Sequence, residues 1–209
     1  INLVGAVTIS AIDKSSVTPA ALGAATPTDV TTAVNGIQVG GRNLLTNSKT
    51  FEGYHNLGNW SRADSDYQGL RVYSRTGAWL GLTQYYNIEA GKTYTFSANA
   101  SGDEMCSVGI YATKVDNSEI SGVNENNLFG NITSWRRISV TFTPTESTTL
   151  RIRVENSVAN SSVNVCGYKL VEGNKDDGWS PAPEDVDSSI SAAQSTADAA
   201  LTRNNTMAV

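Results

Sequence analysis

The chain has 209 residues, a formal net charge of −5 and a pI near 4.9, with 39% hydrophobic and only 17% charged residues. This composition, rich in Ser, Thr, Asn and Gly, is typical of β-rich extracellular or virion-surface proteins. The acidic balance without a Lys or Arg block argues against nucleic-acid binding, and no apolar run is long enough to span a membrane. Because the chain begins at Ile1 without a signal peptide, we expect a mature product or a fragment of a longer protein.

Residues 1–40 are rich in Ala, Thr, Val and Ser and contain almost no aromatic side chain. The stretch 1–9 alternates weakly like an edge strand, and residues 29–36 are compatible with one or two helical turns. Because this segment offers too little apolar surface for a core of its own, we interpret residues 1–40 as an N-terminal connector.

Residues 41–172 hold every tyrosine and three of the four tryptophans, and their apolar side chains recur with a two-residue period. At least seven short strands are predicted, separated by turn signals, with no competing helical period. The expected core-facing residues include Leu70, Val72, Leu80, Leu82, Tyr94, Phe96, Ala98, Val108, Ile110, Ile138, Val140, Phe142, Leu150, Ile152 and Val154. This pattern predicts an all-β fold, a two-sheet antiparallel sandwich of the jelly-roll type.

Residues 173–209 begin with a turn-rich exit and continue as a predicted short helix capped by Asp187 or Ser188. Its apolar seam consists of Val186, Ile190, Ala193, Ala197 and either Ala200 or Leu201. A seam this narrow, about two heptads long and mostly alanine, is marginal for an isolated helix. We therefore expect this helix to associate with copies of itself.

Few residues could carry catalysis. The one histidine, His55, lies in a Gly-rich loop away from any Ser or Cys suited to act as a nucleophile. One His and two widely separated Cys exclude the usual zinc sites, and no phosphate-binding loop occurs. The acidic neighbours Asp64 and Asp66, like Asp103 and Glu104, share single loops, whereas a glycosidase needs two carboxylates across a cleft. We expect no enzyme, no cofactor and no metal site, with a glycan hydrolase as a minor alternative.

Two flanking stretches resemble a known class of module. Gly-Arg-Asn-Leu-Leu at residues 41–45, followed by Trp60, is similar to the opening of carbohydrate-binding jelly rolls in Gram-positive phage tail proteins. Lys-Leu-Val-Glu-Gly at 169–173 and Gly-Trp-Ser-Pro-Ala-Pro-Glu-Asp at 178–185 resemble the end of the same modules. Residues 1–10 look like the segment that follows the structural domain of siphophage tail-tip proteins, the tail-associated lysins or antireceptors. Residues 135–142 are similar to modules that accompany glycanases.

The resemblance implies a non-catalytic carbohydrate-binding module, residues 41–172, within a phage tail-tip or baseplate protein. It further implies a homotrimer on the virion, other tail proteins as partners and a saccharide of the host cell envelope as ligand. It transfers no ligand-binding residue to this sequence. The alternative is a structural spacer or interaction domain of the tail tip that binds no glycan.

A saccharide site needs aromatic surface against the C–H face of the sugar and polar groups for its hydroxyls. If Leu70, Val72, Leu80 and Leu82 face the core, the alternating side chains face outward. We therefore predict carbohydrate contacts from Trp79, Tyr85, Tyr73 and Arg71, and from Trp60 in the loop after the first strand. The alternatives are that these rings cover a sheet edge, that a bulge turns Trp79 inward, or that Trp60 plugs the end of the sandwich.

The two cysteines and the two remaining tryptophans have structural interpretations. In a particle assembled in the bacterial cytoplasm, Cys106 and Cys166 are expected to be buried thiols, with a disulfide as the alternative. A break in the alternation after Cys166 suggests a bulge at Gly167. We expect Trp135 to be a structural ring at a strand entry and Trp179 to dock the exit segment onto the domain.

Overall fold

The computed structural model describes residues 25–30 and 40–207. The chain divides into two units, Ile1–Gln38 and Val39–Val209. In the first unit, residues 27–30 form one helical turn, which therefore begins two residues earlier than predicted. The Thr26 amide donates to the Asp29 carboxylate at 2.7 Å, and the Asp29 amide donates to the Thr26 hydroxyl at 3.1 Å, a reciprocal cap. The predicted strand over residues 1–9 and the predicted helical residues 31–36 lie outside the described residues.

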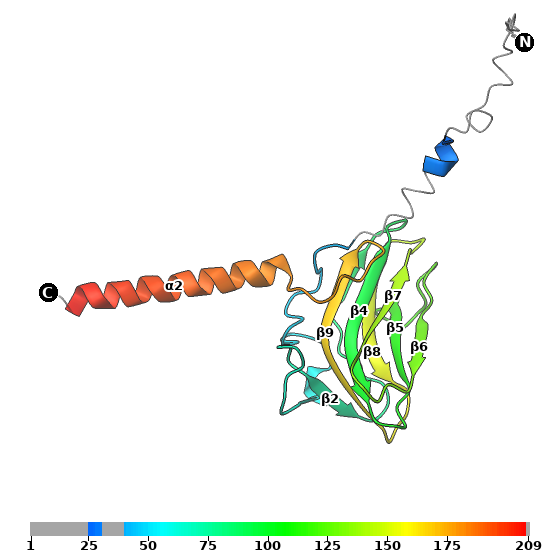
Figure 1. The fold of residues 1–209 in the computed structure, drawn as a ribbon, viewed down its shortest axis with the longest axis horizontal. Helices are drawn as coiled ribbons and strands as arrows, with labels where there is room; N and C mark the ends of the chain where they lie inside the picture. The colour runs from blue at the N-terminus through cyan, green and yellow to red at the C-terminus, as the bar shows by residue number, and fades with distance from the viewer. Residues whose placement is uncertain (1–24, 31–39, 208–209) are drawn as a thin grey trace, which may run out of the picture. The chain divides into compact units, whose positions relative to one another are not determined.

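The described part of the second unit contains nine strands, a short 3-10 helix and one long helix (Figure 1). The elements are η2 (Leu57–Asn59), β1 (Ser61–Arg62), β2 (Tyr73–Thr76), β3 (Tyr85–Ile88), β4 (Tyr94–Gly102), β5 (Val108–Lys114), β6 (Asn126–Gly130), β7 (Arg136–Phe142), β8 (Thr148–Asn156), β9 (Ser162–Glu172) and α2 (Pro183–Met207).

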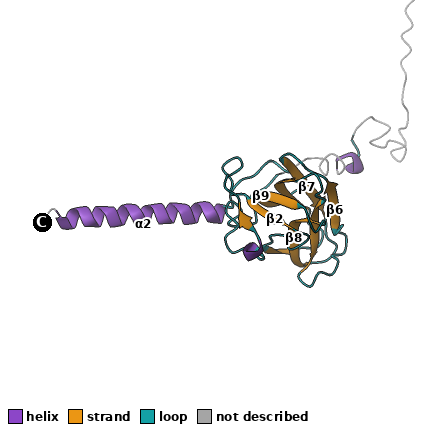
Figure 2. Ribbon diagram, turned by 90° about the horizontal axis from the view of Figure 1, so that it is seen from below, coloured by secondary structure: helices purple, strands orange, loops and turns teal. Residues whose placement is uncertain are grey.

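The strands form two antiparallel sheets. One sheet has the order β1-β2-β9-β4-β7 and the other has the order β3-β8-β5-β6. Figure 2 views the two layers from below, with the strands seen largely end-on. The predicted two-sheet sandwich is confirmed, because each sheet buries one apolar face against the other.

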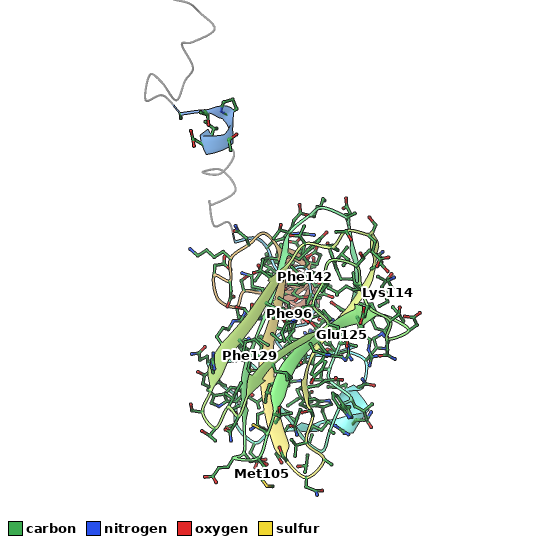
Figure 3. The ribbon with its side chains drawn as sticks, turned by 90° about the vertical axis from the view of Figure 1, so that its right-hand side faces the viewer. Phe96, Met105, Lys114, Glu125, Phe129 and Phe142 are labelled. Carbon is green, nitrogen blue, oxygen red and sulfur yellow. The ribbon has the colours of Figure 1, made fainter. Side chains whose placement is uncertain are left out.

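The core lies between the sheets and comes from the strands in which the two-residue period was clearest. Phe96 of β4, Ile110 of β5 and Ile152 of β8 are at most 1% exposed. Figure 3 labels Phe96 together with Phe142 of β7, a second ring of this core. Each such side chain contributes about 1.5–3 kcal/mol by leaving water, so this interior stabilises the sandwich.

The alternation predicted for residues 70–73 is wrong at Tyr73. Leu70 and Val72 are buried as predicted, but they pack with Cys166 in a small separate cluster. Tyr73, expected to face outward, is 9% exposed and belongs to the main core. Both sides of the chain are covered at this point, because Trp179 packs against the small cluster. A two-residue period distinguishes the inner face only where the two faces differ in polarity, and here both faces carry apolar side chains.

The predicted strand over residues 79–83 is also wrong. Trp79 and Leu80 both have left-handed backbone, with φ of 62° and 60°, and this ends any strand alternation. Leu80, predicted to be in the core, is 40% exposed, whereas Thr83, predicted to face outward, is fully buried. Only Leu82 keeps its predicted place in the core.

The cysteine prediction is confirmed. Cys106 and Cys166 are both free and buried, and burial raises the pKa of the Cys166 thiol to about 11. The register of β9 against β4 shifts between Ser97 and Asn99, opposite Gly167, whose φ is +59°. The predicted bulge at Gly167 is therefore present, and glycine accommodates its left-handed backbone.

The two structural tryptophans occupy the outer side of the β1-β2-β9-β4-β7 sheet. Trp179 donates its indole N–H to the Ser48 hydroxyl at 3.1 Å, so it docks the exit segment as predicted. Trp135 stacks on Tyr67 with a centroid separation of 4.3 Å. Both rings lie against the small cluster of Leu70, Val72 and Cys166.

The C-terminal helix α2 begins at Pro183, earlier than the predicted caps. Proline suits a first helical position, and Glu184 and Asp185 place negative charge in the first turn. Arg42 pairs with Glu184 at 2.8 Å, and the Asn47 amide donates to the Asp185 carboxylate at 2.9 Å. Among the described residues, no helix is both long enough and apolar enough to span a membrane.

The predicted seam of α2 is exposed. Val186 is 42% exposed, Ile190 is 61% exposed and Leu201 is 62% exposed. The apolar side chains that would stabilise this helix in a bundle therefore face solvent in the single chain.

Candidate functional site

An aromatic surface, exposed at Trp79 and Tyr85, lies on the outer side of the β3-β8-β5-β6 sheet. We call it the aromatic face and define it by Trp79, Tyr85, Tyr111, Arg151 and Arg153. Tyr85 of β3 lies opposite Arg151 of β8, and Tyr111 of β5 lies opposite Arg153 of β8. The strand neighbours of these residues point into the core, so alternation turns these side chains away from it.

Trp79 is the most exposed ring of the aromatic face. Its side chain is 50% exposed, and its indole meets the Tyr111 ring edge-on at 5.6 Å and 81°. Tyr111 itself is only 7% exposed, and burial raises the pKa of its hydroxyl. Tyr111 thus supports Trp79 from below, while half of the indole remains available to a ligand.

Tyr85 presents a second ring. It is 37% exposed and stacks on His55, with centroids 4.2 Å apart and planes 22° from parallel. His55 is itself paired to Thr83 in an isolated β-bridge, which anchors the backbone that carries its ring. The stack gives Tyr85 a ring partner before any ligand arrives.

The loop that carries Trp79 is strained and firmly held. Two consecutive non-glycine residues in left-handed backbone cost about 1–2 kcal/mol each. The Trp79 amide donates to the Asn156 carbonyl at 2.8 Å, and the Arg75 guanidinium donates to the Trp79 carbonyl at 3.1 Å. The indole of Trp60 donates to the Leu80 carbonyl at 2.8 Å. Strain that is held by so many contacts is a feature of functional sites.

Gly81 brings the same loop directly onto strand β8. Its amide donates to the Glu155 carboxylate at 3.0 Å, and that carboxylate also accepts from Arg153 at 2.8 Å. A Cβ atom on Gly81 would lie 2.5 Å from the Val154 carbonyl oxygen, so only glycine allows this approach. The Arg153 guanidinium lies 5.8 Å from the Tyr111 ring. A buried, charge-balanced ion pair thus fixes the base of the loop.

Trp79 and Tyr85 are the two candidates that the structure brings together. Tyr73 is buried and packs edge-on against Phe51 at 5.8 Å, so its predicted outward orientation is wrong. Trp60 is 7% exposed and packs in the main core cluster, so little of its ring is accessible to a ligand. Its hydrogen bond to Leu80 instead makes it a positioning residue for the Trp79 loop.

Arg71 lies in the loop just before β2 of the other sheet. Its side chain is partly buried, and its amide donates to the Lys49 carbonyl at 3.1 Å. Its neighbours Leu70 and Val72 belong to the small cluster with Cys166. The predicted grouping of Arg71 with Trp79 and Tyr85 is therefore wrong.

Three members of the aromatic face were missed from the sequence: Tyr111, Arg151 and Arg153. Each alternates with a core residue along its strand, so the period that selected Tyr85 also places these side chains outward. The sequence does not show that β5 and β8 pair beside β3, and only that pairing brings the residues onto one surface.

One member of each acidic pair considered for glycosidase chemistry has a structural partner. Asp103 accepts the Ser162 amide at 2.6 Å and the Met105 amide at 3.0 Å, and these bonds hold its pKa below the ordinary value. Asp66 pairs with Arg62 at 3.4 Å. Among the described residues, no three His, Cys, Asp or Glu side chains gather in a group that would hold a metal ion.

Several solved structures are similar to part of this chain at low sequence identity. Family 16 Carbohydrate Binding Module-2 is 19% identical, with a TM-score of 0.45 over 62% of this chain and all of its own. TmCBM61, solved with β-1,4-galactotriose, is 14% identical, with a TM-score of 0.47 over 63% of this chain and 99% of its own. The CBM22-1 xylan-binding domain of Paenibacillus barcinonensis Xyn10C is 12% identical, with a TM-score of 0.44 over 65% of this chain and 97% of its own. These likenesses concern the fold alone.

No curated protein matches this sequence. The family model described as a carbohydrate binding domain, CBM_4_9, matches residues 43–162, which is more than half of the chain. The match begins just before Leu44 and extends to the first residue of β9, so it spans the whole aromatic face. The chain belongs to the CBM_4_9 family of carbohydrate-binding domains.

Proposed function

We propose that this chain is a non-catalytic carbohydrate-binding module of a phage tail-tip or baseplate protein, and that it binds a saccharide of the host cell envelope. The observation that carries the proposal is the aromatic face, on which Trp79 and Tyr85 are both exposed and each packs against a neighbouring ring. Aromatic rings of this kind pack against the C–H face of a sugar ring, and the neighbouring Arg151 offers hydrogen-bond donors to its oxygens.

The tail-tip setting rests on the flanking stretches at 1–10, 41–45, 169–173 and 178–185, which resemble phage tail proteins. In that setting the module lies on the virion, contacts other tail proteins and acts at the surface of a Gram-positive host during adsorption.

A trimer would make a weak site sufficient. One shallow aromatic site gives a Kd on the order of 0.1–1 mM, or about −4 to −5.5 kcal/mol. Three linked copies raise the avidity by about 10²–10⁴-fold without any new contact. The exposed seam of α2, which includes Val186, Ile190 and Leu201, supports self-association of this helix.

The test is labelling of Gram-positive cells with the fluorescent full chain and two tryptophan variants. Trp79→Ala removes the exposed ring, and Trp135→Ala removes a ring of the same type from the other sheet. We expect saturable labelling of some strains, competed by their purified cell-wall polysaccharide. Labelling should be lost in Trp79→Ala and kept in Trp135→Ala.

Two outcomes contradict the proposal. Absence of saturable binding to every strain, even with a trimerised chain, would favour the structural spacer. Release of reducing ends from cell walls would contradict the non-catalytic part. A loss of melting temperature beyond a few degrees in Trp79→Ala would show that the ring is structural, and Tyr85→Ala then tests the same surface independently.

A further inference from the structure

The aromatic face carries an uncompensated positive charge. Arg151 lies at the centre of its ladder, between Tyr85 of β3 and Thr113 of β5. Among the residues that the structure describes, its guanidinium makes one hydrogen bond, to the Asn117 side-chain oxygen, and no ion pair. The next outward residue on β8, Arg153, is by contrast neutralised by Glu155 at 2.8 Å.

The surroundings of Arg151 are unfavourable for a cation. Burial first, and then the charge of Arg153, lower the pKa of Arg151 below its ordinary value. Glu155 and Tyr85 act in the opposite direction but do not cancel the effect of burial. An arginine still keeps its proton at neutral pH, so the lowered pKa reflects mainly the cost of a partly buried cation, which an anion bound beside Arg151 would offset.

The guanidinium has the geometry for this task. It has five N–H donors in a planar fork, which matches a carboxylate or phosphate through two parallel hydrogen bonds. Its side chain is only partly buried, and Tyr85 lies directly opposite it on the neighbouring strand. A sugar ring stacked on Tyr85 would therefore place its substituents within reach of Arg151.

Building on the function proposed above, we infer that the ligand is an anionic saccharide and that Arg151 binds its carboxylate or phosphate group. The shared chemistry is an oxyanion attached to a sugar or polyol. A uronic-acid polymer and a polyol-phosphate polymer both supply it, and the experiment separates the two sources.

The test uses the full chain and three variants. Arg151→Gln removes the charge, and Arg151→Lys keeps the charge but loses the planar fork. Arg136→Gln is the matched control, because Arg136 on β7 is exposed, lacks an ion pair among the described residues and lies over Phe129, labelled in Figure 3.

The first readout is binding to the labelled cells at 50 mM and 500 mM NaCl. We expect binding to weaken at high salt, because charge pairs at a surface are screened. Arg151→Gln should bind about tenfold to a hundredfold more weakly, as expected for loss of a charge-assisted contact, and should lose most of the salt dependence. Arg151→Lys should lie between the wild type and Arg151→Gln, and Arg136→Gln should match the wild type.

The second readout is isothermal titration with polygalacturonate, poly(glycerol phosphate) and neutral dextran. Binding of either anionic polymer supports the inference and identifies the source. Salt-independent cell binding that Arg151→Gln leaves unchanged would overturn the inference while leaving the proposed saccharide-binding function intact. Absence of any cell binding would overturn both. Melting temperatures of all variants within a few degrees of the wild type confirm that folding is not the cause.

Discussion

The substitution Gly81→Ala tests whether the Trp79 loop is held on strand β8 as described. The added methyl group would lie 2.5 Å from the Val154 carbonyl oxygen, which belongs to a paired central strand and has no freedom to move away. The loop must therefore lift, and the 3.0 Å hydrogen bond from the Gly81 amide to the Glu155 carboxylate breaks. Losing a hydrogen bond to a charged group costs about 1.5–3 kcal/mol, and overpacking costs about 1–3 kcal/mol.

Because lifting the loop relieves part of the clash, the two costs overlap, and we expect a loss of about 3 kcal/mol in the free energy of unfolding. In a domain of this size that corresponds to a fall of about 6–12 °C in melting temperature. Saccharide binding should weaken at least tenfold, because Trp79 moves with the loop. The assays are thermal unfolding followed by circular dichroism and binding to labelled cells.

Gly58→Ala is the matched control, since a Cβ atom on Gly58 would meet no atom within 4 Å. We expect its melting temperature and binding to equal those of the wild type. A Gly81→Ala protein with wild-type stability and wild-type binding would refute the close approach of the loop to β8.

Two further predictions concern a positioning residue and an ion pair. Trp60→Phe keeps the buried ring but removes the donor to the Leu80 carbonyl, so we expect about 1 kcal/mol less stability in urea unfolding and weaker cell binding. Asp176 pairs with Arg137 at 3.1 Å. Burial acts to raise the pKa of Asp176, but its hydrogen bonds and the charge of Arg137 outweigh burial, so the pKa is lowered. Its folded pKa lies below the unfolded value, so this pair stabilises the fold above about pH 4 and the contribution is lost as pH falls further. In Asp176→Asn that part of the pH dependence, measured by urea unfolding between pH 2 and 7, should disappear.

Each of these predictions has a contradicting result. Binding by Trp60→Phe equal to that of the wild type would show that the indole hydrogen bond does not position the loop. An Asp176→Asn protein that loses stability on acidification as steeply as the wild type would show that other carboxylates carry the acid sensitivity.

The sequence predicts the sandwich well where apolar residues alternate with mostly polar ones along a strand, even though both faces of such a strand are largely buried. In β4, β5 and β8 the apolar period identifies core residues such as Phe96, Ile110 and Ile152. The prediction fails at Tyr73, because the exit segment with Trp179 covers the second face of that part of the fold. Tertiary covering of this kind leaves no local periodic signal.

The candidate site was predictable only in part. Tyr85 faces outward because it lies in a true strand, as the period indicates. Trp79 is exposed for another reason, the left-handed backbone at Trp79 and Leu80, which no alternation rule anticipates. Arg151 carries the outward signal in its own strand, but its place beside Tyr85 depends on the pairing of β3 with β8, which is set by the whole fold.

The most direct test of saccharide binding by the aromatic face is a titration of the ¹⁵N-labelled full chain with a soluble fragment of the cell-wall polysaccharide, followed at the four indole N–H resonances. Assignment comes from single Trp→Phe variants. We predict that the Trp79 resonance shifts saturably, because its ring is half exposed, while those of Trp135 and Trp179 on the other sheet stay in place. A saturable shift confined to Trp135 or Trp179, with Trp79 unchanged, would contradict the assignment of the site to the aromatic face.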